Sequence, residues 1–227
     1  MRKVAIFDID GTIFRSSLLI EITEALIQEG IFPSKAQKVY ASSYKKWLDR
    51  KGDYDSYINA VVRAAETYIV GVEKKEYSRI ARRVVSFHKN RVYRYTRDLV
   101  AELRKNNYYI IAISNSPKEM VDAFCKTMGF DKSYGRVYEV DELRRFTGKT
   151  HLELFDDKAE LLKFIVKRDG LSLKDSVGVG DSEGDISFLG LVSRPICFNP
   201  NSKLYNHAKK EGWKIVVERK DMVYHLH

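Results

Sequence analysis

The sequence predicts an α/β fold: a doubly wound, Rossmann-like parallel sheet with an inserted helical cap. Three observations lead to this prediction. Short apolar runs of strand length recur along the chain, amphipathic helical stretches separate them, and one long interval after the first run holds helical patterns only. Strands that alternate with helices are typical of a parallel sheet covered on both faces. With 227 residues, 44% of them hydrophobic, the chain suits one large domain or a core with a smaller insert.

The first strand is expected at residues 4–8, a continuous apolar run that ends in an acid. An uninterrupted run of this kind fits a strand buried on both faces of a parallel sheet. Four similar runs follow, at residues 109–113, 177–179, 195–198 and 214–217. A weaker alternation over residues 135–154 predicts a small β-hairpin, to which we assign no catalytic role.

Helices are expected between these runs. One helical face is shared by Met120, Val121, Phe124, Cys125 and Met128. Gly129 can close that helix, because glycine adopts the left-handed conformation that ends many helices. The apolar spacing over residues 161–166 predicts another helix, which ends before Gly170.

Residues 15–90 contain no convincing strand. Four amphipathic helices are expected there, marked by apolar residues at 18–26, 40–48, 58–65 and 77–87. Ser34 follows Pro33 and forms a predicted capping box with Gln37 at the start of the second helix. We therefore expect residues 15–90 to be a helical cap, inserted into an α/β core of residues 1–14 and 91–227.

The composition narrows the classes of function. Forty Lys and Arg against 31 Asp and Glu give a net charge of +9, which favours anionic partners such as phosphates. These charges are spread over nearly every helix, so a nucleic-acid partner is the minority interpretation. No apolar run approaches the roughly 20 residues of a membrane span, and no leader precedes the first strand. Two cysteines in apolar stretches predict buried thiols, and we expect a soluble, cytoplasmic protein.

Polar side chains stand where three of the apolar runs end, at Asp8, Ser114 and Asp181. Open α/β sheets bind their ligands beyond the carboxyl ends of the strands, close to a switch in strand order. The predicted parallel sheet would therefore bring these three groups to one crevice. Their residue types fit a magnesium-dependent phosphoryl-transfer site.

Asp8 is the candidate nucleophile, because attack of a carboxylate on phosphorus gives an aspartyl-phosphate and divides the reaction into two steps. Asp10 is the candidate acid for the departing alkoxide and base for the attacking water. A carboxylate can approach a phosphate dianion only with charge neutralisation, which Mg²⁺ provides. We expect Asp8, Asp181 and the main-chain carbonyl of Asp10 to bind Mg²⁺, with Asp185 behind them orienting metal-bound water or Lys158.

Several groups are expected at the substrate phosphate. Ser114 offers a hydroxyl, Asn115 a main-chain N–H, and Lys158 an ammonium group for the equatorial oxygens. Gly11 lets the backbone bend beside the nucleophile, and Thr12 hydrogen-bonds within the same loop.

The chain after Ser114 predicts a helix start. Ser116 and Glu119 fit a capping box, with Pro117 at the first helical position. The free N–H groups at this amino end would face an anion.

Each of these motifs also has an ordinary structural explanation. An Asp-x-Asp pair is common in surface turns, and Ser182 with Asp185 fits a capping box at a helix start. Ser114 alone reads as a strand-end hydroxyl, and Lys158 is one of many lysines, with Lys149 nearby. The order of the motifs along the chain favours a site over these separate explanations.

With these motifs in place, the chain resembles the phosphatases of the haloacid dehalogenase superfamily, specifically the branch of phosphoserine-phosphatase-like enzymes. The first motif of that superfamily matches Asp8-Ile9-Asp10-Gly11-Thr12, and the second matches Ile113-Ser114-Asn115-Ser116. The third-motif lysine matches Lys158, and the fourth motif matches Gly180 to Asp185. A helical cap between the first two motifs, and Asn199-Pro200 followed by Leu204, also resemble that branch.

The resemblance implies a hydrolase of phosphate monoesters with Mg²⁺ as cofactor and a small phosphorylated metabolite as substrate. Asp10 argues against dehalogenase chemistry, which lacks the second acid. Phosphoserine phosphatases usually carry a glutamate for the substrate amine where this chain has Ser16 and Ser17, and Glu21 lies a turn later. They also commonly have serine at the position of Gly11. Phosphoserine is therefore an alternative substrate, phosphotransfer to another acceptor is a second alternative, and a non-catalytic nucleic-acid-binding protein is a third.

Overall fold

A single mixed sheet organises the molecule. The computed structural model describes residues 1–226, so the last residue of the expected core, His227, lies outside the described residues. The strands are β1 (Arg2–Phe7), β2 (Tyr109–Pro117), β3 (Lys132–Val140), β4 (Phe146–Leu152), β5 (Leu171–Gly180), β6 (Arg194–Phe198), β7 (Lys214–Arg219) and β8 (Met222–Leu226). Within the described part of the chain they form one eight-stranded sheet in the order β4-β3-β2-β1-β5-β6-β7-β8.

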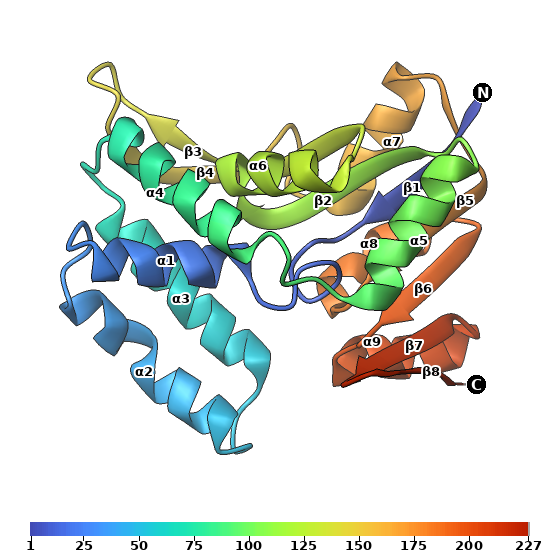
Figure 1. The fold of residues 1–227 in the computed structure, drawn as a ribbon, viewed down its shortest axis with the longest axis horizontal. Helices are drawn as coiled ribbons and strands as arrows, with labels where there is room; N and C mark the ends of the chain where they lie inside the picture. Colours follow the sequence, from blue (N-terminus) through green and yellow to red (C-terminus); the bar gives the residue numbers. More distant parts are fainter. Residues whose placement is uncertain (227) are drawn as a thin grey trace.

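Six strands run parallel, and the antiparallel strands β4 and β8 lie at the two edges (Figure 1). β1 lies between β2 and β5, where the chain order changes direction. The carboxyl ends of β1, β2 and β5 therefore meet at one edge of the sheet, where open α/β folds bind their ligands.

Both faces of the sheet are covered by helices, as the sequence predicts for a doubly wound fold (Figure 1). One face carries α5 (Arg94–Lys105) and α6 (Lys118–Met128), and the other carries α7 (Lys158–Arg168), α8 (Ile186–Leu189) and α9 (Ser202–Glu211). A hydrophobic core lies on each face of the sheet, and the side chains of β1 alternate between the two. Ala5 and Phe7 belong to the first core, and Val4 and Ile6 belong to the second. The continuous apolar run at the N-terminus is thus explained by burial on both sides.

Four helices lie in the chain between β1 and α5. They are α1 (Leu18–Gln28), α2 (Lys35–Leu48), α3 (Tyr54–Tyr68) and α4 (Lys74–His88). α2 packs on α3, and α4 lies between α1 and α6, which connects this group to the sheet-covering helices (Figure 1). The four expected helices are confirmed, but the predicted capping box is wrong. Ser34 makes no side-chain capping bond, and the N–H of Gln37 bonds its carbonyl instead.

Other expectations have clear outcomes. The hairpin over residues 135–154 is confirmed as β3 and β4, and Gly129 ends α6 in the left-handed conformation. Cys125 and Cys197 are buried free thiols. Among residues 1–226, no helix has both the length and the apolar character to cross a membrane. Neither α5 nor the edge strand β8 was predicted.

Candidate active site

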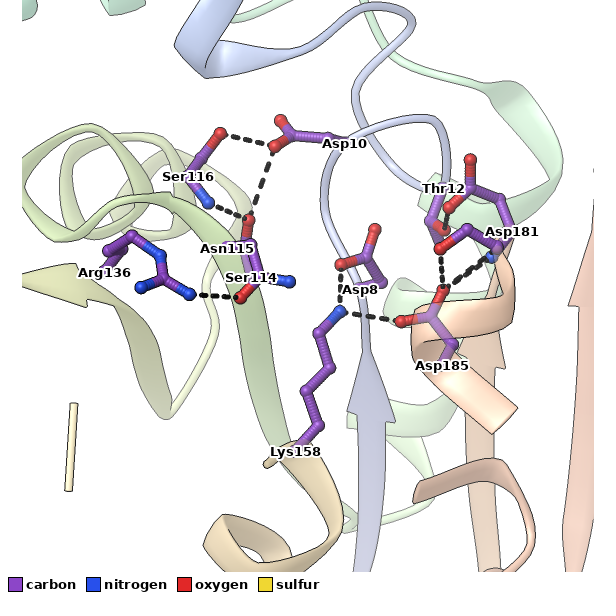
Figure 2. Close-up of polar contacts among 11 residues, drawn as sticks. Asp8, Asp10, Thr12, Ser114, Asn115, Ser116, Arg136, Lys158, Asp181 and Asp185 are labelled. Carbon is purple, nitrogen blue, oxygen red and sulfur yellow. Dashed lines mark hydrogen bonds and ion pairs between the residues drawn. The ribbon is translucent and has the colours of Figure 1, made fainter. Parts of the chain in front are cut away.

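The buried ammonium of Lys158 joins two carboxylates at the carboxyl edge of the sheet. Its Nζ lies 2.7 Å from Asp8 Oδ1 and 2.7 Å from Asp185 Oδ1 (Figure 2). Asp8 follows directly after β1, and Lys158 is the first residue of α7. The N–H groups of Ala159 and Glu160 bond the side chain of Asp157, which fixes the start of that helix. The expected neighbourhood of Asp8, Lys158 and Asp185 is therefore present.

Three carboxylates form a cluster around this lysine. Oxygen atoms of Asp8, Asp181 and Asp185 all lie within 4.8 Å of one another. The three come from the ends of β1 and β5 and from the short helix η1 (Glu183–Asp185). Converging carboxylate oxygens are the donor set that hard divalent cations prefer, so the residues present fit Mg²⁺.

Local backbone geometry brings Asp181 and Asp185 together. Asp185 Oδ2 accepts hydrogen bonds from the main-chain N–H groups of Asp181, at 3.0 Å, and Ser182, at 3.1 Å. Ser182 and Asp185 form a capping box, as predicted, and Asp181 stands just outside it. Gly180 allows this close turn, because a Cβ there would lie 2.6 Å from Asp185.

Gly11 is needed for the approach of Asp181 to the first motif. Its φ is +75°, and a Cβ on it would lie 2.1 Å from Asp181 Oδ2. The hydroxyl of Thr12, also buried, donates to Asp181 Oδ1 at 3.4 Å. The loop after β1 therefore shapes the position of Asp181, in addition to carrying Asp8.

The electrostatics of the cluster reflect its burial. Desolvation raises the pKa of Asp8 to about 7; Lys158 opposes this shift, whereas Asp185 and Asp10 add to it. Desolvation and the charge of Asp8 also raise the pKa of Asp181 well above its ordinary value. Burial alone would lower the pKa of Lys158, but Asp185 and Asp8 outweigh it and the net direction is upward. The lysine therefore stays charged. Its single positive charge does not fully offset the desolvation of Asp8 and Asp181, so the pKa values of these two carboxyls stay raised.

Asp10 has its own set of partners, separate from the cluster. Its Oδ1 accepts from the main-chain N–H of Leu18 at 2.8 Å. Its Oδ2 accepts from the hydroxyl of Ser116, as Figure 2 shows. Burial raises the pKa of Asp10, and these hydrogen bonds partly oppose the shift. The buried hydroxyl of Ser116 also accepts from Leu19 N–H at 3.1 Å. Asp10 is thus held between the start of α1 and the end of β2.

The predicted capping box at α6 is wrong. Ser116 ends up in β2, Pro117 is the residue before the helix, and no side chain caps its first turn. The hydroxyl of Ser116 instead serves Asp10, which is 106 residues away in the chain. A local pattern cannot reveal a partner so distant, so this role of Ser116 was missed.

The other predicted phosphate-binding residues lie next to this region. The buried Ser114 has its Oγ 3.5 Å from Asp10 Oδ2 and accepts from the N–H of Ser116 at 3.0 Å. Asn115 is exposed, and its Oδ1 accepts from Arg136 at 3.5 Å (Figure 2). The structure thus brings all the predicted site residues to one edge of the sheet.

Comparison with known proteins agrees with this geometry. The family model described as haloacid dehalogenase-like hydrolase matches residues 5–190. The chain belongs to this family. The match covers all four motifs, from the strand before Asp8 to the helix after Asp185.

The relatives and solved structures that the chain resembles include phosphoserine phosphatases. It is 25% identical to the phosphoserine phosphatase SerB1 of Mycobacterium tuberculosis, over 95% of this chain and 70% of the relative. It is 23% identical to a histidinol-phosphatase of Neisseria meningitidis, over 95% of this chain and 99% of the relative. A solved phospho-aspartyl intermediate analogue of phosphoserine phosphatase has the same fold, with a TM-score of 0.63, 21% identity, and coverage of 97% and 95% of the two chains. The protein is a phosphatase of the haloacid dehalogenase family.

Proposed function

We propose that this phosphatase hydrolyses a small organic phosphate monoester through an aspartyl-phosphate on Asp8, with Mg²⁺ as cofactor. One observation carries the proposal: the buried ammonium of Lys158 lies 2.7 Å from Asp8, inside a cluster that Asp181 and Asp185 complete. A surface cluster of acids would not hold a buried lysine among them. This arrangement fits a site that concentrates positive charge next to a carboxylate nucleophile.

The first step assigned to Asp8 is attack of a carboxylate oxygen on phosphorus. A bond forms between that oxygen and phosphorus, the bond from phosphorus to the ester oxygen breaks, and the leaving oxygen takes the proton of Asp10. Burial raises the pKa of Asp10, which favours the protonated form that this step needs. Water then attacks the phosphorus of the aspartyl-phosphate and gives a proton to Asp10. The bond from phosphorus to the Asp8 oxygen breaks, which restores the carboxylate of Asp8 and releases inorganic phosphate.

Mg²⁺ would be held by carboxylate oxygens of Asp8 and Asp181 and by the main-chain carbonyl of Asp10, with Asp185 next to them. When bound, it supplies positive charge that neutralises the carboxylates and the phosphate oxygens. Lys158 supplies the same kind of charge, because its ammonium lies 2.7 Å from both Asp8 and Asp185. Ser114 and the N–H of Asn115 are proposed to bind the phosphoryl oxygens.

Phosphoserine is not the favoured substrate. The carboxylate of Glu21 is already occupied: it accepts from Ser16 at 2.6 Å and from Arg91 at 2.8 Å, and it lies 3.1 Å from His88 Nε2. Ser17, at the start of α1, carries no charge for a substrate amine. The relatives are named for two different phosphate esters at similar identity, so we propose only a small phosphorylated metabolite as the substrate class.

Helices α1–α4, within residues 15–90, are proposed to cap the site. The start of α3 contacts α9 of the core, where Asp55 Oδ2 lies 3.3 Å from Lys203 Nζ. Lys203 also donates a hydrogen bond to Oε1 of Glu183 at 2.5 Å, and Glu183 is two residues after Asp181 in the chain. The pKa of Tyr54, next to Asp55, is raised by desolvation and then by the carboxylates of the site, which supports a position near them. The two buried free thiols support a cytoplasmic location.

The test is a phosphatase screen across amino-acid, sugar, nucleotide and lipid-headgroup phosphates, with and without EDTA. We expect Mg²⁺-dependent release of inorganic phosphate from at least one class, and no release by the Asp8→Asn variant. Undiminished activity under chelation would contradict the metal role. Transfer of phosphate to an added alcohol, detected by product analysis, would replace hydrolysis with phosphotransfer. Salt-sensitive binding of duplex nucleic acid by a protein without any phosphatase activity would overturn the proposal.

A further inference from the structure

The pairing of β2, which carries the second motif, with β3 is irregular at that motif. β2 and β3 pair regularly up to Ile113 and Tyr134, and the next pair is Pro117 with Arg136. Residues 114–116 therefore stand opposite the single residue Gly135, and the register of the ladder shifts there. A bulge of this kind turns side chains away from the sheet and is common beside active sites.

Gly135 makes the bulge possible. A Cβ at this position would lie 2.7 Å from the Cα of Lys118 and 3.0 Å from the carbonyl oxygen of Ser116. Since these contacts are to backbone atoms, no side-chain movement could relieve them. β3 thus packs directly against the chain that follows Ser114, and the next residue, Arg136, is placed beside the second motif.

The guanidinium of Arg136 points toward Asn115, the neighbour of Ser114 (Figure 2). Nη2 of Arg136 lies 3.5 Å from Asn115 Oδ1, a long hydrogen bond to a neutral group. The arginine is half-buried. Among residues 1–226, no carboxylate forms an ion pair with it. A half-buried guanidinium without a carboxylate partner is free to bind an anion.

Lys118, which lines the same cleft as Arg136, is different in this respect. It pairs with Asp122 at 2.5 Å and lies 3.5 Å from Glu153. Acids of this chain therefore neutralise the charge of Lys118. Arg136 keeps its charge available on the side of Ser114 opposite to the carboxylate cluster, as Figure 2 shows.

We propose that Arg136 is a substrate-binding residue that takes an anionic oxygen, of a phosphate or a carboxylate, on the β3 side of Ser114. This inference rests on the phosphatase function proposed above and narrows its substrate class. Two sources can supply such an oxygen: the phosphoryl group that is transferred, or a second acidic group in the organic part of the substrate. The planar guanidinium can bind either with two parallel hydrogen bonds.

The experiment is a calorimetric titration with Mg²⁺ present, using two probes that need no turnover. Inorganic phosphate represents the transferred group, and 3-phosphonopropionate, a non-hydrolysable phosphonate with a carboxylate, also carries a second anion. The proteins are the wild type, Arg136→Gln and Arg136→Lys. Lys132→Gln is the matched control, because it removes one positive charge from the exposed start of the same strand.

We expect Arg136→Gln to weaken binding on the order of tenfold to a hundredfold, the usual range for a charge-assisted contact. Arg136→Lys should lose less, because it keeps the charge but not the two parallel hydrogen bonds. Equal weakening for both probes assigns Arg136 to the transferred phosphoryl group, and weakening for 3-phosphonopropionate alone assigns it to a second acidic group. Unfolding temperatures of the variants near that of the wild type would show that the fold is kept.

Three results would overturn the inference: wild-type affinity of Arg136→Gln for both probes, an equal loss in Lys132→Gln, or failure of the wild type to bind either probe. Turnover separates this inference from the proposed function. A wild type that hydrolyses phosphate esters, together with an Arg136→Gln variant that is indistinguishable in binding and in kcat/KM, removes Arg136 and leaves the phosphatase intact. A wild type without turnover on any ester removes the proposed function, and the titrations still decide whether Arg136 binds the anion.

Discussion

The ammonium nitrogen of Lys158 lies 2.7 Å from Asp8 Oδ1, and both side chains are almost completely buried. Asp185 accepts a second bond from the same nitrogen at the same distance. A buried ion pair costs desolvation, and the loss of one partner leaves the other charge uncompensated. The ion pair is therefore weak evidence for a stabilising role, and a catalytic role of Asp8 explains it better.

Asp8→Asn should abolish turnover and keep the fold. The amide has nearly the same shape and still offers an oxygen to Lys158, but it cannot form an aspartyl-phosphate. We expect kcat to fall by at least on the order of a thousandfold with 4-nitrophenyl phosphate. Asp175→Asn is the control, because Asp175 is exposed and pairs with Lys3 away from the site. Retained turnover in Asp8→Asn would refute the assigned nucleophile.

Mg²⁺ should stabilise the protein more at pH 8 than at pH 5. The pKa of Asp8 is raised from its ordinary 3.8 to about 7, so between these values the folded protein binds more protons than the unfolded chain. This contribution to stability is present below about pH 4 and is lost as the pH rises through about 7. Mg²⁺ replaces the lost protons, because it binds the ionised carboxylates.

The measurement is the unfolding temperature in EDTA and in Mg²⁺ across this range of pH, where 1 kcal/mol corresponds to roughly 2–4 °C for a chain of this size. In EDTA, the unfolding temperature of Asp8→Asn should change less with pH than that of the wild type. An equal effect of Mg²⁺ at pH 5 and pH 8 would contradict the assignment of these carboxylates as its ligands.

The sequence predicted the central strands because they are buried on both faces and therefore read as unbroken apolar runs. β8 was missed for the opposite reason: it is an edge strand, and most of its residues are exposed. The sequence of α5 is dominated by charged residues, and only three of its twelve residues, Thr96, Val100 and Leu103, are buried. Apolar runs identify elements that are enclosed by the fold, and they fail at its periphery.

The positions of Asp8 and Asp181 were predicted because each residue follows directly after its own strand. The prediction failed where a side chain had a choice between a local and a distant partner. Ser116 fits a capping box with Glu119, yet its hydroxyl bonds Asp10 in the loop after β1. Gly135 and Arg136 carried no local signal, because their role depends on the register between β2 and β3.

Ser116→Ala should impair Asp10 as a proton donor. The variant removes the hydroxyl that bonds Asp10 and that accepts from Leu19 N–H. We expect kcat to fall on the order of tenfold to a hundredfold for alkyl phosphates, whose alkoxide must be protonated, and much less for 4-nitrophenyl phosphate. Ser116→Thr keeps a hydroxyl and should restore most of the rate. Equal losses for both leaving groups would assign Ser116 a purely structural role.

Glu21→Gln should affect stability and leave substrate choice unchanged. Its carboxylate joins α1 to the end of α4 through Arg91 and His88. Replacement of this partly buried charge should lower the free energy of unfolding by about 1–2 kcal/mol, as measured by urea denaturation. The control is Glu76→Gln, on the exposed side of α4. A rise in KM for phosphoserine alone would show that Glu21 binds a substrate amine after all.

Gly11→Ala should disrupt the metal site, and Gly30→Ala provides the control. Both glycines have φ near +75°, so alanine costs each of them about 1–2 kcal/mol of backbone strain. They differ in their surroundings. A Cβ at Gly11 would lie 2.1 Å from Asp181 Oδ2, whereas nothing lies within 4 Å of one at Gly30.

The difference between the two variants therefore isolates the displacement of Asp181 from the backbone strain that they share. We expect Gly11→Ala to bind Mg²⁺ at least about tenfold more weakly in calorimetry, and to lose turnover in proportion. Gly30→Ala should unfold at a slightly lower temperature and keep both properties. If Gly11→Ala binds Mg²⁺ as tightly as Gly30→Ala does, then Asp181 is either free to move without consequence or not a ligand of the metal.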